Sequence, residues 1–228
     1  MVFKGSVLLC MLAVIGFTSC KNNDYVVKPF VITGINVVNA GTDTLNFYLN
    51  GTRQNGLSSI YPAGATGLLR ELAGAQNYQF KKVGRPDVLF SLPLNLTSHT
   101  FNSVYITGGS ADKTFITRDT VLQLDTFKNT TAVRFVNAAP DAGNLSVSVG
   151  DTVKFNTRAF KSTSIFLLTG SGQKRVRVFL PGVTAARLDT TITFQSNVSY
   201  TIFAKGLLAG KGTAAFNIGV IINQLSYQ

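Results

Sequence analysis

Apolar and polar residues alternate along most of the chain. The run Arg175–Leu180 alternates basic or aromatic residues with aliphatic ones, and Tyr200, Ile202 and Ala204 recur with the same period. A period of two is that of a β-strand with one buried face. Turn pairs such as Asn50-Gly51 and Pro181-Gly182 separate these runs at intervals of about 8 to 12 residues. The pattern therefore predicts an all-β protein.

Only one stretch, residues 66–75, has a composition typical of a helix. Glycines at positions 67 and 74 interrupt it, and each glycine lowers helix stability by about 1 kcal/mol relative to alanine. We therefore expect no long helix there.

The strand pattern occurs twice. The segment Val37–Asp43 matches the segment Phe135–Asp141, and Asn39 and Asn137 within them are 98 positions apart (137 − 39). This spacing, with one two-residue insertion, persists over most of each copy. It predicts two sandwich domains of about seven strands, residues 27–124 and 131–228, joined by a linker of residues 125–130.

The N-terminal segment has the order of a secretory signal. Lys4 lies in a short polar start, residues 7–16 are almost wholly apolar, and the small residues Thr18 and Ser19 precede Cys20. The apolar stretch is about half of the ~20 residues that a membrane-spanning helix needs. Residues 17–20 resemble the lipobox of bacterial lipoproteins, with Phe17 in place of the usual aliphatic residue. We therefore predict a lipoprotein signal peptide over residues 1–19, with an ordinary signal peptide and an incidental cysteine as the alternative.

The cysteine count supports lipid attachment at Cys20. The chain has two cysteines, and Cys10 lies inside the predicted leader, so none remains to pair with Cys20. Two or more acyl chains give stable attachment to a membrane. We expect a flexible tether over residues 20–26 and a cell-envelope protein anchored through its lipid, in the outer membrane, with its periplasmic or surface face left open.

The second copy resembles a known family at its first strand. The segment Val133–Asp141 combines an arginine-containing strand, small residues and Pro-Asp, as the domain of unknown function family 4397 does, and Tyr200 matches a later strand of that family. The first copy departs from this pattern at Asn36 and Thr42. The resemblance implies two tandem immunoglobulin-like β-sandwich domains after a lipoprotein signal peptide, and it implies no chemistry.

The residues that catalysis or metal binding would require are scarce. His99 is the single histidine, and its neighbours Leu96–Thr100 predict an exposed loop. Sulfur and imidazole ligands for a metal are absent from the predicted mature chain apart from Cys20 and His99. The segment Gly206–Thr213 lacks the spacing of a phosphate-binding loop and is predicted to be a glycine-rich connection between strands. We therefore predict no catalytic residues, no metal site and no cofactor.

Three other features have structural interpretations. Asp43 and Asp141 occupy the same place in both copies, and we expect their side chains to close the turn after the first strand. Tyr200 resembles a tyrosine corner, in which the hydroxyl bonds to upstream backbone. Short Asp-Thr motifs, including those at Thr44 and Thr152, resemble an O-glycosylation site of some bacterial envelopes.

The chain is strongly basic. It has 21 lysines and arginines against 10 acidic residues, a formal charge of +11. No nucleic-acid-binding motif accompanies this charge, so we expect no nucleic acid, and anionic glycans, lipids or an envelope protein as partners. The densest cluster is Lys174, Arg175 and Arg177, where Arg175 and Arg177 are expected on one solvent face. The alternative is a solvated basic strand without a ligand.

These observations favour a non-enzymatic envelope lipoprotein that acts as a binding, adhesion or scaffold module for glycans or other envelope components. The alternative is an accessory domain of glycan processing with weak hydrolase-type activity. Glu71 and Asp87 are the acidic residues that such an activity could use. Two carboxylates about 5 to 10 Å apart in a cleft would favour hydrolysis, and flat sheet faces with aromatic residues would favour binding.

Overall fold

The computed structural model describes residues 31–120, 122–125 and 127–223. The predicted signal peptide, the tether and Cys20 lie outside these residues. Within them the chain forms strands and two short 3-10 turns, η1 (Ala111–Lys113) and η2 (Gly212–Ala214), and no α-helix. The segment with helical composition contains a strand, Leu69–Leu72.

The first half of the structure, from Ile32 to Asp119, contains eight strands. They are β1 (Ile32–Asn39), β2 (Leu45–Leu49), β3 (Thr52–Arg53), β4 (Leu69–Leu72), β5 (Gly74–Lys82), β6 (Phe90–Leu96), β7 (Phe101–Ile106) and β8 (Thr114–Asp119). Asn50 and Gly51 connect β2 to β3 with φ of 51° and 79°, as the expected turn requires.

The second half, from Thr130 to Ile222, also contains eight strands. They are β9 (Thr130–Asn137), β10 (Leu145–Val149), β11 (Val153–Arg158), β12 (Leu167–Gly170), β13 (Gly172–Phe179), β14 (Leu188–Phe194), β15 (Ser199–Lys205) and β16 (Asn217–Ile222).

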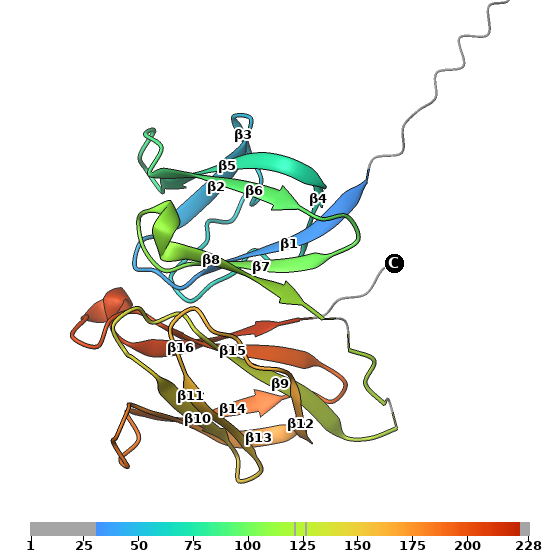
Figure 1. Ribbon diagram of the computed structural model, residues 1–228, viewed down its shortest axis with the longest axis vertical. Coiled ribbons are helices and arrows are strands. Elements are labelled where there is room, and N and C mark those ends of the chain that lie inside the picture. Colours follow the sequence, from blue (N-terminus) through green and yellow to red (C-terminus); the bar gives the residue numbers. More distant parts are fainter. Residues whose placement is uncertain (1–30, 121, 126, 224–228) are drawn as a thin grey trace, which may run out of the picture. The chain divides into compact units, whose positions relative to one another are not determined.

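Each half is a sandwich of two four-stranded sheets. In the first half the strand orders are β4-β1-β7-β8 and β3-β2-β5-β6, and Figure 1 shows β2, β5 and β6 in one layer and β1, β7 and β8 in the other. In the second half the orders are β12-β9-β15-β16 and β11-β10-β13-β14. The strand order of the second half is that of the first with eight added to each number, so the predicted repeat is confirmed, with eight strands in each half where about seven were expected. We call the sheets containing β1 and β9 the central sheets, and those containing β2 and β10 the outer sheets.

Each central sheet contains a parallel pair of strands. β1 pairs with β7 and β9 with β15 in parallel, whereas the other strand pairs are antiparallel. The sheets of an immunoglobulin fold are antiparallel. The two-sheet sandwich agrees with the family resemblance, and the parallel pair is a difference from the immunoglobulin pairing.

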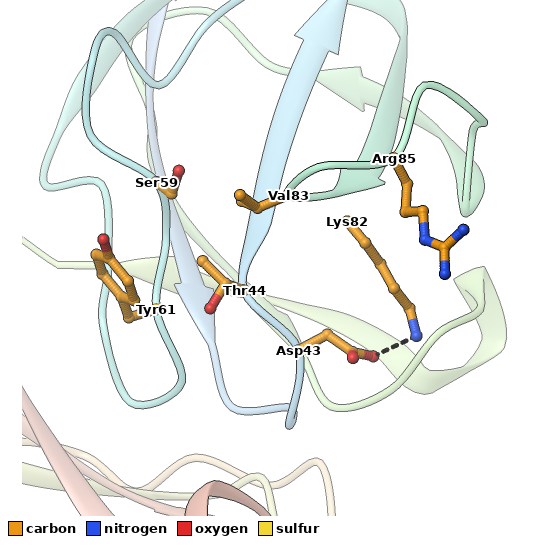
Figure 2. A pocket seen from close by; sticks show the side chains of 7 residues that line it. All are labelled: Asp43, Thr44, Ser59, Tyr61, Lys82, Val83 and Arg85. Carbon is orange, nitrogen blue, oxygen red and sulfur yellow. Dashed lines mark ion pairs between the residues drawn. The ribbon is translucent and has the colours of Figure 1, made fainter.

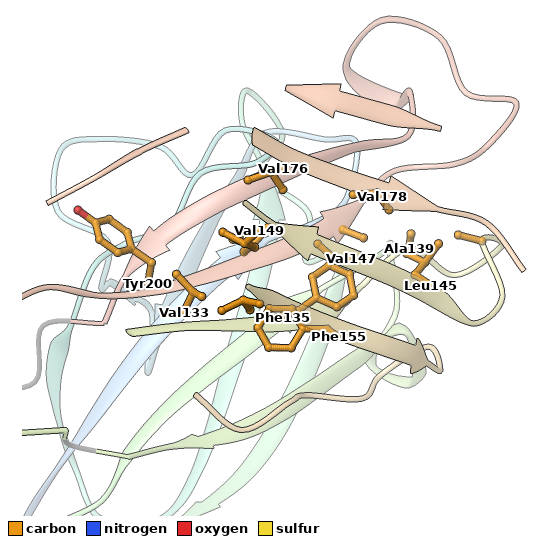
Figure 3. Close-up of a cluster of buried hydrophobic side chains, with 14 of the residues drawn as sticks. Val133, Phe135, Ala139, Leu145, Val147, Val149, Phe155, Val176, Val178 and Tyr200 are labelled. Atoms are coloured by element: carbon orange, nitrogen blue, oxygen red, sulfur yellow. The ribbon is translucent and has the colours of Figure 1, made fainter. Parts of the chain in front are cut away.

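The outer sheets bury one face. β6 alternates strictly between buried and exposed residues, and in β13 the buried Val176 and Val178 alternate with Arg175 and Arg177. Their inward side chains pack on the central sheet of the same half. Figure 3 shows this core in the second half, where Phe135 from β9 and Phe155 from β11 stack with ring centroids 6.3 Å apart.

The central sheets bury both faces. All seven residues of β15 are buried, as are seven of the eight in β9. One face packs inside its own sandwich, and the other contributes to a cluster shared by the two halves. The members of this shared cluster are Val38, Ala40, Tyr105, Val136, Ala138, Phe203 and Ile221. The chain from Val31 onward is accordingly one compact unit.

The shared cluster brings equivalent positions of the two halves together. Tyr105 and Phe203 are 98 positions apart in the sequence, and their rings meet edge to face with centroids 6.0 Å apart. Val38 and Val136, and likewise Ala40 and Ala138, have the same spacing and lie in the same cluster. The contact between the halves is therefore approximately two-fold, like an isologous dimer interface.

Tyr200 has the predicted structural role. Its hydroxyl accepts a hydrogen bond of 3.0 Å from the backbone N–H of Gln195, and its ring packs edge to face on Phe194. In Figure 3 the ring lies at one end of the core with its hydroxyl directed away from the cluster. The upstream backbone is thereby fixed to the start of β15.

Candidate functional site

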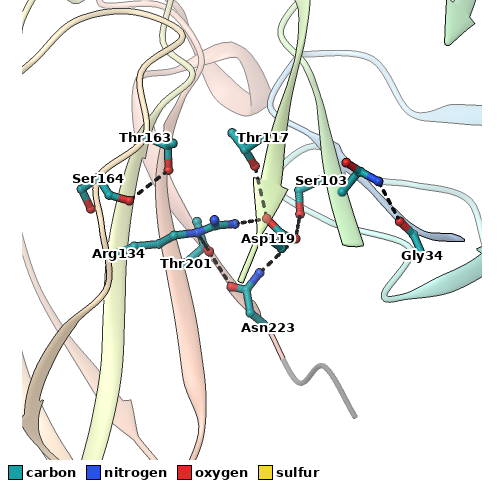
Figure 4. A network of polar contacts seen from close by, with 10 residues as sticks. Gly34, Ser103, Thr117, Asp119, Arg134, Thr163, Ser164, Thr201 and Asn223 are labelled. Carbon is teal, nitrogen blue, oxygen red and sulfur yellow. Dashed lines mark hydrogen bonds and ion pairs between the residues drawn. The ribbon is translucent and has the colours of Figure 1, made fainter. Parts of the chain in front are cut away.

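A buried polar network connects the two central sheets. The guanidinium of Arg134 on β9 forms an ion pair with Asp119 on β8, and both side chains are 3% exposed. Arg134 Nε also donates to Thr201 Oγ1 at 2.7 Å, while Ser103 Oγ donates to Asp119 Oδ2 at 2.6 Å. Figure 4 shows these side chains converging between β8 and β9. Both charged groups have partners, so the network acts as a structural connection.

Asparagines close the turns after the first strand of each half. Asn39 donates from Nδ2 to the carbonyls of Asp43 and Ile60, and its Oδ1 accepts from the N–H of Gly41. Asn137 makes the equivalent bonds to Gly143, Arg158 and Ala139. Both asparagines are fully buried. The loops at this end of each sandwich are therefore fixed by one repeated amide.

This corrects the role expected of Asp43 and Asp141. The Asp43 carboxylate forms an ion pair with Lys82 Nζ at 2.9 Å, and the Asp141 carboxylate accepts from the N–H of Leu208. Neither side chain closes its own turn. The amide of asparagine was the better candidate because it both donates and accepts, whereas a carboxylate only accepts.

The first hollow lies at the loop end of the first half. It has a volume of about 410 Å³ and is lined by Asp43, Thr44, Ser59, Tyr61, Lys82, Val83 and Arg85. Figure 2 shows Tyr61 and Arg85 at opposite ends of the group, with Thr44 and the Asp43–Lys82 ion pair between them. Tyr61 is 65% exposed. An open aromatic ring thus stands beside hydroxyl, carboxylate and cationic groups.

A second hollow of about 460 Å³ lies where loops of the two halves meet. It is lined by Ala40, Thr42, Thr107, Gly108, Gly109, Asp112, Lys113, Pro140, Phe160, Gly206 and Leu207. Lys161 Nζ donates to the carbonyl of Asp112, and Thr213 Oγ1 donates to that of Thr42, so contacts between the halves also border it. Its lining contains few charged groups, and it offers a ligand less hydrogen bonding than the first hollow.

The three basic residues predicted to bind anions do not share one face. Lys174 lies on the inward side of β13 with Val176, and its side chain runs past Gly150 toward Gly170. Arg175 faces outward and forms two hydrogen bonds with Asp189, at 2.8 and 2.5 Å. Arg177 faces outward beside it. Whether these residues bind a ligand stays a prediction.

The other sequence candidates fall in structural positions. His99 lies in the turn between β6 and β7 with φ of 54°. The segment Gly206–Thr213 joins β15 to β16, as predicted, and a Cβ on Gly206 would lie 2.3 Å from the carbonyl oxygen of Ala215. That position therefore requires glycine for packing. Thr152 is exposed and Thr44 half-buried.

Glu71 and Asp87 do not form a paired site in either hollow. Glu71 on β4 is buried, and Asp87 is exposed in the connection between β5 and β6. Burial raises the pKa of the Glu71 carboxyl, and the nearby Tyr78 hydroxyl offsets part of that rise. Hydrolase-type activity stays an untested alternative.

Two kinds of feature are absent from the described part of the chain. It contains no helix that is long and apolar enough to cross a membrane. Those same residues also contain no group of three or more histidine, cysteine, aspartate or glutamate residues that could hold a metal ion.

The fold is that of a tandem β-sandwich protein in which the second half repeats the strand order of the first. A family model described as Domain of unknown function (DUF4397) matches residues 33–148 and, separately, residues 131–226. The chain therefore belongs to the DUF4397 family. No curated protein matches the chain.

Two solved structures illustrate the distant likenesses found. One is CBMbc, a family CBM26 module of Eubacterium rectale Amy13K in complex with maltoheptaose, with 9% identity, coverage of 83% of this chain and 96% of that chain, and a TM-score of 0.27. Another is the Bacillus anthracis TIE protein, with 9% identity, coverage of 79% and 34%, and a TM-score of 0.25. At such scores neither structure identifies a ligand or a site in this chain.

Proposed function

We propose that this protein is a non-enzymatic binding module of the cell envelope, tethered by a lipid at Cys20, whose ligands are glycans or other envelope components. The immunoglobulin-like sandwiches act as an adhesion or scaffold unit held off the membrane by residues 20–26. The proposal draws on the lipobox-like leader and on the shape of the loop end of the first half. Binding requires no cofactor.

The first hollow is the observation that carries this proposal. Small-ligand sites combine an apolar or aromatic wall with a few placed polar groups. Tyr61 supplies the ring, Ser59 and Thr44 supply hydroxyls, and the Asp43–Lys82 pair supplies both an acceptor and a donor. A sugar ring presents an apolar face and a rim of hydroxyls, so it matches both features.

A glycan array with the fragment of residues 21–228 tests this function. We expect selective binding of a glycan, and Tyr61→Ala should weaken that binding at least about tenfold, since exposed aromatic residues are frequent binding hot spots. Leu57→Ala is the matched control, because Leu57 is fully exposed but does not line the hollow. Absence of binding to every glycan and envelope fraction, or equal losses in the two variants, would contradict the proposal.

A further inference from the structure

A row of outward-facing residues crosses the outer sheet of the second half. Ser148 on β10 lies directly opposite Lys154 on β11 and opposite Arg177 on β13, and Arg177 lies opposite Asp189 on β14. Directly opposed residues have Cβ atoms about 4.5–5.5 Å apart on the same face. The short serine therefore stands between two long cationic side chains and is only 6% exposed; we call these three residues the notch.

Two polar atoms in this row have no hydrogen-bond partner among the described residues. They are Ser148 Oγ and Arg177 Nε, and both are buried. The Arg177 guanidinium lies 6.0 Å from the ring centroid of Phe179, so it extends along the sheet surface. An unpaired buried donor costs free energy, because it has lost its hydrogen bonds to water. Two of them on directly opposed residues point to a group that the chain itself does not supply.

The basic side chains of this face differ in whether they form an ion pair. Arg175 is paired with Asp189 through two hydrogen bonds, and Asp151 also acts electrostatically on Arg175. Asp189 lies near Arg177 as well, but within the described residues neither Arg177 nor Lys154 forms an ion pair. Lys154 and Arg177 are therefore the two cations of this face whose charge remains available to pair with an external anion.

The same row in the first half differs at each position. There Tyr48 lies opposite Arg53 and opposite Gln79, and Gln79 lies opposite Ser91. The tyrosine fills the place of the notch, with Lys81 Nζ 5.0 Å from its ring centroid. The position of Arg177 is occupied by Gln79, whose side chain is a neutral amide. The first half thus provides an internal comparison that lacks both the short serine and a cation at the position of Arg177.

We propose that the notch formed by Lys154, Ser148 and Arg177 binds a sulfate or carboxylate group of an acidic polysaccharide. This inference rests on the proposed binding function and adds a second, charge-selective site to it. Arginine and lysine form charge-assisted hydrogen bonds with such groups, and the serine hydroxyl donates a third. Gln173, Thr191 and Thr193 share the outward face and supply partners for neighbouring sugar hydroxyls. These neutral groups favour a polysaccharide over a lipid surface.

The test measures the affinity of the 21–228 fragment for a heparin-derived hexasaccharide, with maltohexaose as the neutral probe and phosphatidylglycerol vesicles as the lipid probe. We expect Arg177→Gln to weaken hexasaccharide binding about tenfold or more, the loss expected for one charge-assisted contact. Ser148→Tyr should weaken it similarly while leaving every charge in place. Both variants introduce the residue that the first half carries, and thermal unfolding verifies that they fold.

Arg70→Gln is the control. It removes the same unit of charge from an exposed arginine on β4 of the first half, and it should change the affinity less than about twofold, as expected for a distant screened charge. Equal losses in Arg70→Gln and Arg177→Gln, equal binding of maltohexaose, or binding to vesicles alone would overturn this inference. The Tyr61→Ala variant tests the first hollow on the glycan array. None of these outcomes affects that result, so the proposed function is tested separately.

Discussion

The central and outer sheets of this protein have diverged in different ways. In the central sheets, equivalent residues of the two halves contact each other, as Tyr105 and Phe203 do. Residues that are not equivalent have diverged there into complementary partners, as in the ion pair between Arg134 and Asp119. In the outer sheets, equivalent residues face solvent and have diverged without such a constraint, as Gln79 and Arg177 show. The comparison indicates that the central sheets hold the halves together and that the outer sheets are open to acquire ligands.

Removing one partner from an ion pair in each kind of sheet tests this comparison. The buried pair should give the largest change in the free energy of unfolding. Asp119→Ala leaves Arg134 buried without its partner, which should lower the free energy of unfolding by about 3–5 kcal/mol. Asp189→Ala removes the partner of Arg175 on the outer sheet, where the side chains are 64% and 39% exposed, and should have a much smaller effect because solvent screens the pair. Urea unfolding of both variants measures the difference. Equal costs would show that the contact between the central sheets is as accessible to water as the outer sheet.

Tyr200→Phe tests a contact inside one sandwich and should have an intermediate effect. The variant keeps the ring on Phe194 and removes the hydroxyl that accepts from Gln195. We expect a loss of about 1 kcal/mol in the free energy of unfolding, the net contribution of one hydrogen bond. An unchanged urea midpoint would show that water replaces the phenol oxygen at no cost.

Glu71→Gln should have the smallest effect, and its sign depends on pH. Because burial raises the pKa of Glu71 in the folded state, folding favours the protonated acid, and stability declines as pH rises from the unfolded-state pKa through the folded-state pKa. The amide of the variant cannot ionise, so the variant should gain stability relative to the wild type as the pH is raised from about 4 to about 7. Asp87→Asn, at an exposed turn, is the control. A pH-independent difference for the Glu71 variant would contradict the buried-acid account.

The period-two pattern predicted the outer strands well because each buries one face. The central strands were harder to interpret, since β9 and β15 are buried on both faces and their alternation is less regular. Apolar residues on both faces are typical of strands covered on both sides. In the sequence, this departure from alternation indicates that both faces of these strands are covered, as they are where the two halves pack on one another.

The candidate sites were less predictable because they depend on register. Lys174, Arg175 and Arg177 are neighbours in sequence, yet strand alternation places Lys174 on the opposite face. Lys154 and Ser148 join Arg177 only through strand pairing, which the sequence does not specify.

The loop that carries Tyr61 was unpredictable for a related reason. Its position depends on the amide of Asn39, which holds the carbonyl of the preceding residue, Ile60. The repeated asparagine was visible in the repeat, and its capacity to donate and accept identifies it as the turn-closing residue.

Calorimetry of the unmodified 21–228 fragment tests the central claim most directly. If the central sheets unite the halves, heating should give one transition whose calorimetric enthalpy equals its van't Hoff enthalpy. Two resolved transitions, each with the enthalpy expected of a domain of about 100 residues, would show that the sandwiches unfold independently and would contradict the account.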